Sequence, residues 1–241
     1  MKKFLTLILL AATMTSFGQN DIFGSIKKKI GGGSTGSSLS STDIVAGLKQ
    51  ALTLGAEKSA DRLSAVNGFF KDAAVKILLP EQAQKVEKTL RSMGMGKLVD
   101  DAIASMNHAA EDASKQAAPI FVNAIKSMTV NDGLKILQGT DTAATGYLRQ
   151  NTTPELTKAF TPIVDSALIK TDATKYWKEV FETYNKLPTT FNKVDPNLSA
   201  YVTQKAISGI FYYVAQEEIL IRKDPSAQVT ELLKKVFGGK S

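Results

Sequence analysis

The sequence predicts an all-α protein: a single bundle of about eight to ten helices around a long central helix, preceded by a signal peptide and a flexible linker. Three observations lead to this class. Apolar residues recur at helical spacing along most of the chain, nothing alternates with period two over a useful length, and one long stretch keeps its apolar stripe throughout. Roughly 200 residues follow the N-terminal segments, enough for one sizeable core.

Residues 96–128 carry the long stripe and predict the central helix. Its apolar positions follow an eleven-residue repeat: Leu98, Ala102, Met106, Ala109, Ala113, Ala117, Ile120, Ala124 and Met128. Eleven residues in three turns lie close to the natural helical period, so the stripe stays on one face of a nearly straight helix. Unbroken, that helix would be about 45 Å long. Pro119 lies inside this pattern and Pro162 inside a later one, and we expect a kink or a break at each.

Residues 1–18 are a predicted signal peptide. Two lysines precede an apolar run at 4–12, and the small residues Ser16 and Gly18 occupy the −3 and −1 positions of a cleavage site. The alternative is an N-terminal membrane anchor, but the run is far shorter than the ~20 residues that a span needs. We therefore expect an exported, periplasmic protein cleaved near Gly18, with no transmembrane segment in the mature chain.

Residues 19–41 are a predicted flexible linker, rich in glycine and serine, and the all-helical domain is predicted to cover 42–238. The linker begins with a short apolar and basic segment at 20–30. That segment suits a peptide that binds a membrane surface or a partner, or a mature N-terminus that packs loosely.

The composition excludes several classes of function. The chain has no cysteine, which rules out structural disulfides, thiolate metal sites and a cysteine nucleophile. Loss of the two lysines of the signal peptide lowers the net charge from +7 to +5. This excess is small and scattered, so we expect no nucleic-acid partner.

The first helix of the domain is expected to begin at a cap, Ser41 or Thr42. It should end at Asn67 and Gly68, with the glycine supplying the left-handed residue. The apolar segment at 75–79 that follows could be extended or form a helical turn.

The later helix boundaries are marked by proline, glycine and threonine. Pro80 is expected to start a helix that Gly94 stops. After the central stretch, Thr129, Thr140 and Thr153 each precede a helix-like run, so we expect short helices with tight connections there. A last helix should follow Asp224 and Pro225 and end at Gly238.

An aromatic stripe at 176–187 is either core or the wall of a ligand pocket. Core is the favoured interpretation, and the pocket remains the alternative. The candidate pocket residues are the large aromatic side chains Phe121, Trp177, Phe181, Phe211 and Tyr212.

A polar network is predicted around the last large helix, which begins at Leu198. Glu217 falls on its apolar stripe, where an unpaired carboxylate would cost several kcal/mol. Glu218 lies four residues before Arg222, the favourable order for an ion pair on a helix. We expect Glu217, Glu218 and Arg222 to meet Asn107 or Glu111 of the central helix in one partly buried, structural network.

His108 is the only histidine, and with Glu111 and Asp112 it makes the single metal-like spacing in the chain. The favoured alternative is a solvated helix face. A di-iron bundle would need a second histidine, and no glycine-rich loop has the context of a phosphate site. Neighbouring carboxylates such as Asp100 and Asp101 point about 100° apart on a helix, so they do not by themselves form an acid and base pair. The sequence therefore predicts no metal, no cofactor and no identified catalytic residue.

Several stretches together resemble one family: LLPEQAQKVEKTLRSMGMGKLVDD, MNHAAE, APIFVNAIKSMT, LQGTDTAATGYLRQNT and the ending YVTQKAISGIF, IRKDP and LLKKVFG. They span nearly everything from Leu48 to Phe237. The chain is similar to an uncharacterised family of exported bacterial helical proteins, the domain-of-unknown-function family numbered 4197. That resemblance implies an exported helical domain and no established activity.

Three hypotheses of function follow. The first is a non-enzymatic envelope module that binds another protein or itself. The second is a binder of an apolar or amphiphilic small molecule in a pocket between helices, and the third a metal-dependent or carboxylate-based enzyme. A filled core would favour the first, a deep apolar cavity the second, and convergence of Asn107, His108 and Glu111 with another carboxylate in a cleft the third. Partners are therefore envelope proteins or an apolar ligand, and the oligomeric state is not predicted.

Overall fold

The computed structural model describes residues 40–170, 174, 177, 178, 185 and 197–223, apart from the side chains of Gln82 and Thr89. These residues hold seven α-helices, one short 3-10 helix and no strand, which confirms the all-α class with slightly fewer helices than predicted. The helices are α2 (Ser41–Ser64), η1 (Glu81–Ala83), α3 (Gln84–Ser92), α4 (Gly96–Ser114), α5 (Ala117–Ser127), α6 (Val130–Gln138), α7 (Ala143–Ile169) and α9 (Leu198–Lys223). Among the described helices, none is long and apolar enough to cross a membrane.

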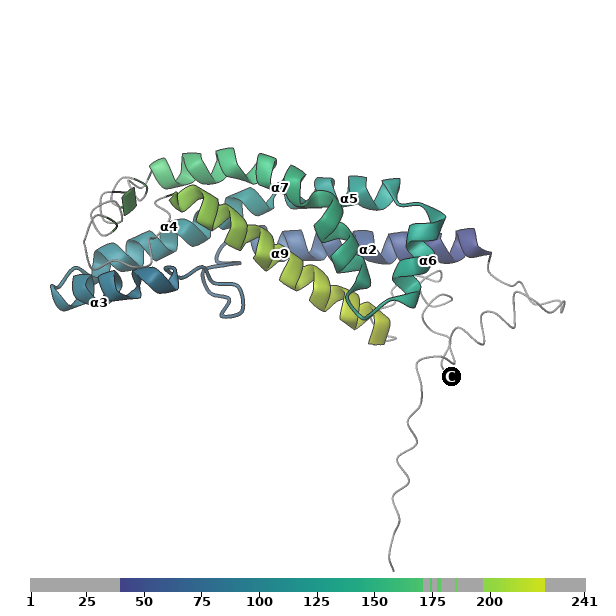
Figure 1. Ribbon diagram of the computed structural model, residues 1–241, viewed down its shortest axis with the longest axis horizontal. Coiled ribbons are helices and arrows are strands. Elements are labelled where there is room, and N and C mark those ends of the chain that lie inside the picture. The colour runs from purple at the N-terminus through teal and green to yellow at the C-terminus, as the bar shows by residue number, and fades with distance from the viewer. Residues whose placement is uncertain (1–39, 171–173, 175–176, 179–184, 186–196, 224–241) are drawn as a thin grey trace, which may run out of the picture. The chain divides into compact units, whose positions relative to one another are not determined.

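The helices from Ser41 onward belong to one compact unit. Within it α9 packs on α7, α2 and α4, and α4 packs on α7 as well (Figure 1). Apolar side chains from all these helices fill one main core, in which the rings of Phe121 and Phe211 are 5.6 Å apart. The largest fully buried side chains of this core include four phenylalanines.

The predicted central helix is two helices. α4 ends at Ser114, a turn at Lys115 and Gln116 follows, and α5 begins at Ala117. The expectation of one unbroken helix is therefore wrong, and the expected break near Pro119 is confirmed. Pro119 has no N–H and its ring collides with the carbonyl four residues earlier, so the chain cannot continue as one helix through that point. The alanine stripe stays fully buried across the turn, which lets neighbouring helices approach closely.

α7 is one helix where the sequence predicted short ones. Pro154 and Pro162 both lie inside it, so the predicted helix start after Thr153 is wrong. Of the two outcomes expected at Pro162, a kink or a break, the break is wrong. Both prolines are exposed, as are Gln150 and Lys158, the residues whose carbonyls lose a backbone donor. Water can bond these carbonyls, which keeps the cost of each proline low enough for the helix to continue.

The predicted boundary residues differ in their outcome. Thr129 caps α6, since its hydroxyl accepts from the backbone N–H of Asp132 at 3.1 Å and the Asp132 carboxylate accepts from the Thr129 N–H. After α2 the left-handed residue is Asn67, with φ of 65°, and not Gly68. Gly68 is needed for space, because a Cβ there would lie 2.5 Å from a carbonyl oxygen of α2. Gly94, with φ of 80°, ends α3 as predicted. The predicted helix at 226–237 and most of the aromatic stripe at 176–187 lie outside the described residues.

Candidate functional site

Asn107, on the buried face of α4, binds the backbone of the segment that precedes η1. Its Oδ1 accepts from the N–H of Ile77 at 2.8 Å, and its Nδ2 donates to the carbonyls of Ile77, at 2.8 Å, and Ile103, at 2.7 Å. The amide thus satisfies both backbone groups of Ile77, as a neighbouring strand would. This decides the open question at 75–79: Ile77 to Leu79 follow a turn, belong to no helix and are held by Asn107.

Glu111, one turn further along α4 and 5 % exposed, holds the turn that follows α2. Its Oε1 accepts from the backbone N–H groups of Phe69 and Phe70, both at 3.1 Å, while its Oε2 lies 2.9 Å from His108 Nδ1. Asp112 points elsewhere and pairs with Lys115. His108, Glu111 and Asp112 therefore do not converge, and the described residues contain no cluster of three such side chains that could hold a metal ion.

Glu218, 4 % exposed on α9, caps a helix from a distance. Its carboxylate accepts from the N–H groups of Ala144, at 2.9 Å, and Thr145, at 2.8 Å, in the first turn of α7, and from the Thr145 hydroxyl at 2.8 Å. The residue at the α7 N-cap, Thr142, makes no side-chain cap bond of its own. The negative carboxylate also lies at the positive end of the α7 dipole, where it is stabilised.

Arg222 completes this cap. Its Nε and Nη2 donate to Glu218 Oε1 at 3.1 and 2.9 Å, and Nη2 also donates to the carbonyl of Ile136 in the last turn of α6, at 3.0 Å. The pair Glu218 and Arg222 therefore joins the end of α6 to the start of α7. The role of this pair is structural, because each bond lies within α9 or joins α9 to the end of α6 or the start of α7.

The predicted polar residues fall into separate groups. Glu218 is the fully buried carboxylate of α9, whereas Glu217, which the sequence placed on the apolar stripe, is half-buried. Glu217 instead faces α2, with its Oε2 3.6 Å from Lys58 Nζ. Within the described chain no hydrogen bond or ion pair joins Glu218 and Arg222 to Asn107 or Glu111, so the structure places these residues in independent clusters.

A further cluster has no signal in the sequence. Asp72, in the turn after α2, accepts from Arg62 of α2 and from Tyr213 of α9. Partial burial alone would raise the pKa of Asp72, but these hydrogen bonds outweigh it and hold the pKa below the usual value. Burial, then the bond to Asp72, raises the pKa of Tyr213 to about 12. These residues share no periodic spacing, so only the fold could bring them together.

The candidate aromatic residues also separate. Phe121 and Phe211 are core residues, and Tyr212 is exposed against the edge of Tyr213. Phe181 lies outside the described residues. Trp177 is buried, stacks on Tyr201 with ring centroids 6.4 Å apart, and lines a cleft.

This α3–α4 cleft has a volume of about 650 Å³ and is open on one side. Its lining comes from η1 and α3, from α4, from the end of α7, and from Trp177 and the first residue of α9. The lining is mostly aliphatic and aromatic: Leu79, Ala83, Val86, Leu90, Leu98, Val99, Ala102, Ala104, Met106, Ala109, Ala167, Trp177 and Leu198. Small alanines on the α4 wall leave the space, because larger side chains at those positions would fill it.

Charged side chains stand at the edge of the cleft. Its three acids are each paired: Glu87 with Arg91 at 2.9 Å, Asp101 with Lys97 at 2.6 Å, and Asp112 with Lys115 at 2.8 Å. Lys170, just past α7, is exposed and forms no ion pair with any described residue. Counted over the described residues alone, the cleft therefore offers an apolar interior with one unpaired cation, Lys170, at its edge.

Comparison with known proteins gives one match. A family described as "Protein of unknown function (DUF4197)" matches residues 38–238. No curated protein and no solved structure matches the chain.

Proposed function

The chain belongs to DUF4197, a family of proteins of unknown function, and we propose that it is a binding protein whose α3–α4 cleft holds the apolar chain of a small acidic amphiphile. The observation that carries the proposal is the cleft itself. Its volume of about 650 Å³ lies within the range of small-molecule sites, and its lining is largely apolar. Of the three hypotheses drawn from the sequence, a cavity of this kind favours the second.

The charges at the edge of the cleft favour a ligand with an acidic headgroup. The three carboxylates at the edge of the cleft are neutralised by neighbouring basic residues, whereas Lys170 has no described counter-ion. An amphiphile that places its tail against Leu90 and Met106 could bring a carboxylate to this ammonium group. At the edge of the cleft such a pair is worth about 1 kcal/mol, or roughly five-fold in affinity.

The polar side chains near the cleft favour binding over catalysis, because they are already hydrogen-bonded within the protein. Asn107 and Glu111 are occupied by backbone groups, and the Ser105 hydroxyl donates to the carbonyl of Asp101 at 2.9 Å. Export to the periplasm, as proposed from residues 1–18, would place such a binder where amphiphiles leave or enter membranes. An envelope protein that docks on the helical surface is the competing proposal, and the experiment below separates the two.

Trp177 is the only tryptophan in the chain and lines the cleft, so its fluorescence reports directly on occupancy. Saturated fatty acids of increasing length should shift its emission, and the dissociation constant should fall about four-fold per added methylene until the cleft is full. Lys170→Met should lower the affinity for fatty acids about five-fold and leave the affinity for alcohols of the same chain length unchanged. Lys158→Met, an exposed lysine of α7 away from the cleft, is the matched control.

A filled cleft should bind nothing. Ala102→Phe, on the α4 wall, should abolish the response, whereas Ala46→Phe, exposed on α2, should leave it intact. If fatty acids fail to change the Trp177 emission of the parent protein, or bind Ala102→Phe as well, the proposed site is wrong.

A further inference from the structure

A second concave surface, the α7–α9 groove, has a different character. It has a volume of about 540 Å³ and lies between the two helices that make the most extensive contact in the fold. Five of its residues form one stripe on α7 at intervals of four: Arg149, Thr153, Thr157, Thr161 and Asp165. The α9 side adds further polar residues, among them Thr203, Gln204 and Ser208.

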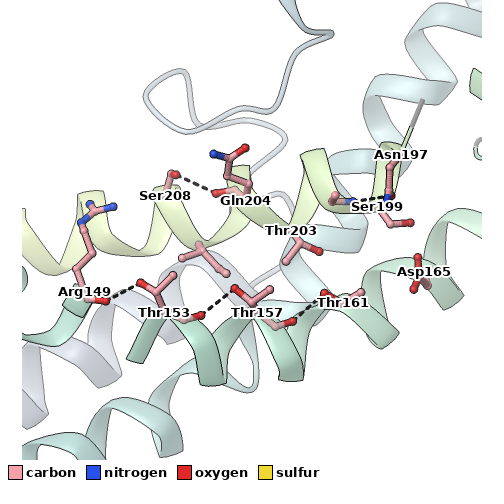
Figure 2. Close-up of a pocket in the computed structure, with 12 residues that line it drawn as sticks. Arg149, Thr153, Thr157, Thr161, Asp165, Asn197, Ser199, Thr203, Gln204 and Ser208 are labelled. Carbon is pink, nitrogen blue, oxygen red and sulfur yellow. Dashed lines mark hydrogen bonds between the residues drawn. The ribbon is translucent and has the colours of Figure 1, made fainter. Parts of the chain in front are cut away.

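Figure 2 shows the threonines as a ladder that faces α9, with Arg149 at one end and Asp165 at the other. The Thr153, Thr157 and Thr161 hydroxyls donate to the carbonyls of Arg149, Thr153 and Thr157, at 2.6, 2.8 and 2.8 Å. Their protons are therefore used within α7, and the lone pairs remain free. The ladder is an array of hydrogen-bond acceptors spaced about 6 Å apart.

Thr203 adds an independent observation on the opposite wall. Its side chain lies between the two helices (Figure 2), the residue is only 3 % exposed, and its hydroxyl has no hydrogen-bond partner among the described residues. A buried hydroxyl without a partner costs free energy that a bound group could recover. In the part of the chain that the structure describes, the groove thus combines free acceptors with a buried hydroxyl that has no partner.

Elsewhere in this fold a side-chain amide on the face of a helix binds a peptide backbone. From the face of a helix, Asn107 binds both backbone groups of Ile77, a residue outside any helix, at 2.8 Å each. Gln204 presents the same amide group in the groove, and its side chain forms no hydrogen bond with any described residue. Along one edge of an extended peptide the N–H groups recur about every 6.6 Å, close to the 6 Å spacing of the ladder.

The two ends of the groove differ in charge. Arg149 stacks 4.4 Å above the ring of Phe211 and has no carboxylate partner among the described residues, and Asp165 has no described cation. They are 16 residues apart on one helix, which corresponds to about 24 Å, or roughly seven residues of extended chain. We propose that the α7–α9 groove binds an extended peptide of about seven residues through its backbone, with its acidic end at Arg149 and its basic end at Asp165.

The probe is the heptapeptide KAVAVAE with free termini, titrated into the full mature chain and followed by calorimetry and by backbone amide shifts. The expected result is binding, with shifts concentrated on α7 and α9. N-methylation of alternate peptide bonds, which removes the donors that the ladder would accept, should weaken binding at least ten-fold. Equal binding of the methylated peptide would overturn the proposal.

Variants of the groove separate binding from folding. Thr203→Val keeps the shape of the side chain and removes the unpaired hydroxyl. It should leave the melting temperature unchanged or raise it, and it should lower the affinity for the peptide several-fold. Thr157→Val should lower the affinity for the peptide in the same way, whereas the control Thr53→Val, on α2, should leave it unchanged. No loss of affinity in both groove variants would contradict the proposal.

A carbohydrate is the competing ligand for a hydroxyl-lined groove, and a neutral oligosaccharide such as chitotetraose tests it. If the oligosaccharide shifts the α7 and α9 amides and the heptapeptide does not, the ligand class proposed here is wrong. Absence of shifts with the peptide at about millimolar concentration would refute it equally.

Discussion

The cap that Glu218 and Arg222 build between α6, α7 and α9 makes a quantitative prediction. Arg222→Met removes the cation beside a carboxylate that is 4 % exposed and also removes a donor from the Ile136 carbonyl. Stranding a buried charge in this way costs about 3 kcal/mol. Glu218→Leu strands the Ala144 and Thr145 N–H groups together with Arg222, and we expect about 4 kcal/mol.

The double variant distinguishes a cap from a simple ion pair. A simple buried pair replaced by apolar residues should return most of the lost stability. Here the backbone groups of two helix ends stay without partners, so the double variant should remain about 4 to 5 kcal/mol below the parent, less than the sum of the single losses.

Urea denaturation followed by far-ultraviolet circular dichroism measures each free energy of unfolding. The matched control is Lys223→Met, the next residue along α9, which pairs with Asp141 at 2.6 Å but is 62 % exposed and should cost less than about 1 kcal/mol. The reasoning is refuted if Arg222→Met behaves like this control. A double variant within about 1 kcal/mol of the parent would show that Glu218 does not cap α7.

Three further predictions concern other parts of the fold. Asn107→Leu should destabilise the protein by about 3 kcal/mol, because both backbone groups of Ile77 lose their partner, and an unchanged urea midpoint would contradict this. Gly133→Ala should lower the free energy of unfolding by about 1 to 3 kcal/mol, since the new Cβ would lie 2.7 Å from both methyl groups of Val45; a melting temperature equal to the parent's would argue that α6 can shift freely. The pKa of Asp72 is lowered in the folded state, so its contribution to stability is present above its ordinary value of 3.8 and is lost as the pH falls through the lower folded pKa. The parent should therefore be more stable than Asp72→Asn at pH 7 and lose that advantage below about pH 3.8, and a difference that is constant with pH would refute the assignment.

Four of the buried or partly buried polar side chains share one task. Asn107 and Glu111 bind backbone groups in the segment between α2 and α3, and Glu218 and Arg222 bind those at two helix ends. Buried backbone N–H and C=O groups need partners, and outside helices their own neighbours cannot supply them. This explains why long helices of a largely apolar bundle carry buried carboxylates and an amide. None of these four side chains lines the α3–α4 cleft or the α7–α9 groove.

Local features of the sequence were sufficient for the helical class and for several boundaries. The capping box at Thr129 and Asp132, the stop at Gly94 and the break before Pro119 all depend on groups within a few residues of one another. Such short-range chemistry acts in the same way wherever the segment lies in the fold. The same local rules failed at Pro154, because the cost of a proline in a helix depends on whether water reaches the carbonyl that it leaves unpaired.

By itself the sequence determined that the described chain is helical, which stripes are buried and which residues deserve attention. It could not determine whether Glu217 or Glu218 is the buried carboxylate, because adjacent residues differ by about 100° around a helix and both phases fit the apolar stripe. Glu218 is the buried one because the N–H groups at the start of α7, more than 70 residues away in the sequence, need an acceptor. The cleft beside Trp177 and the groove beside Thr203 likewise exist only where separate helices meet, so tertiary structure alone decided them.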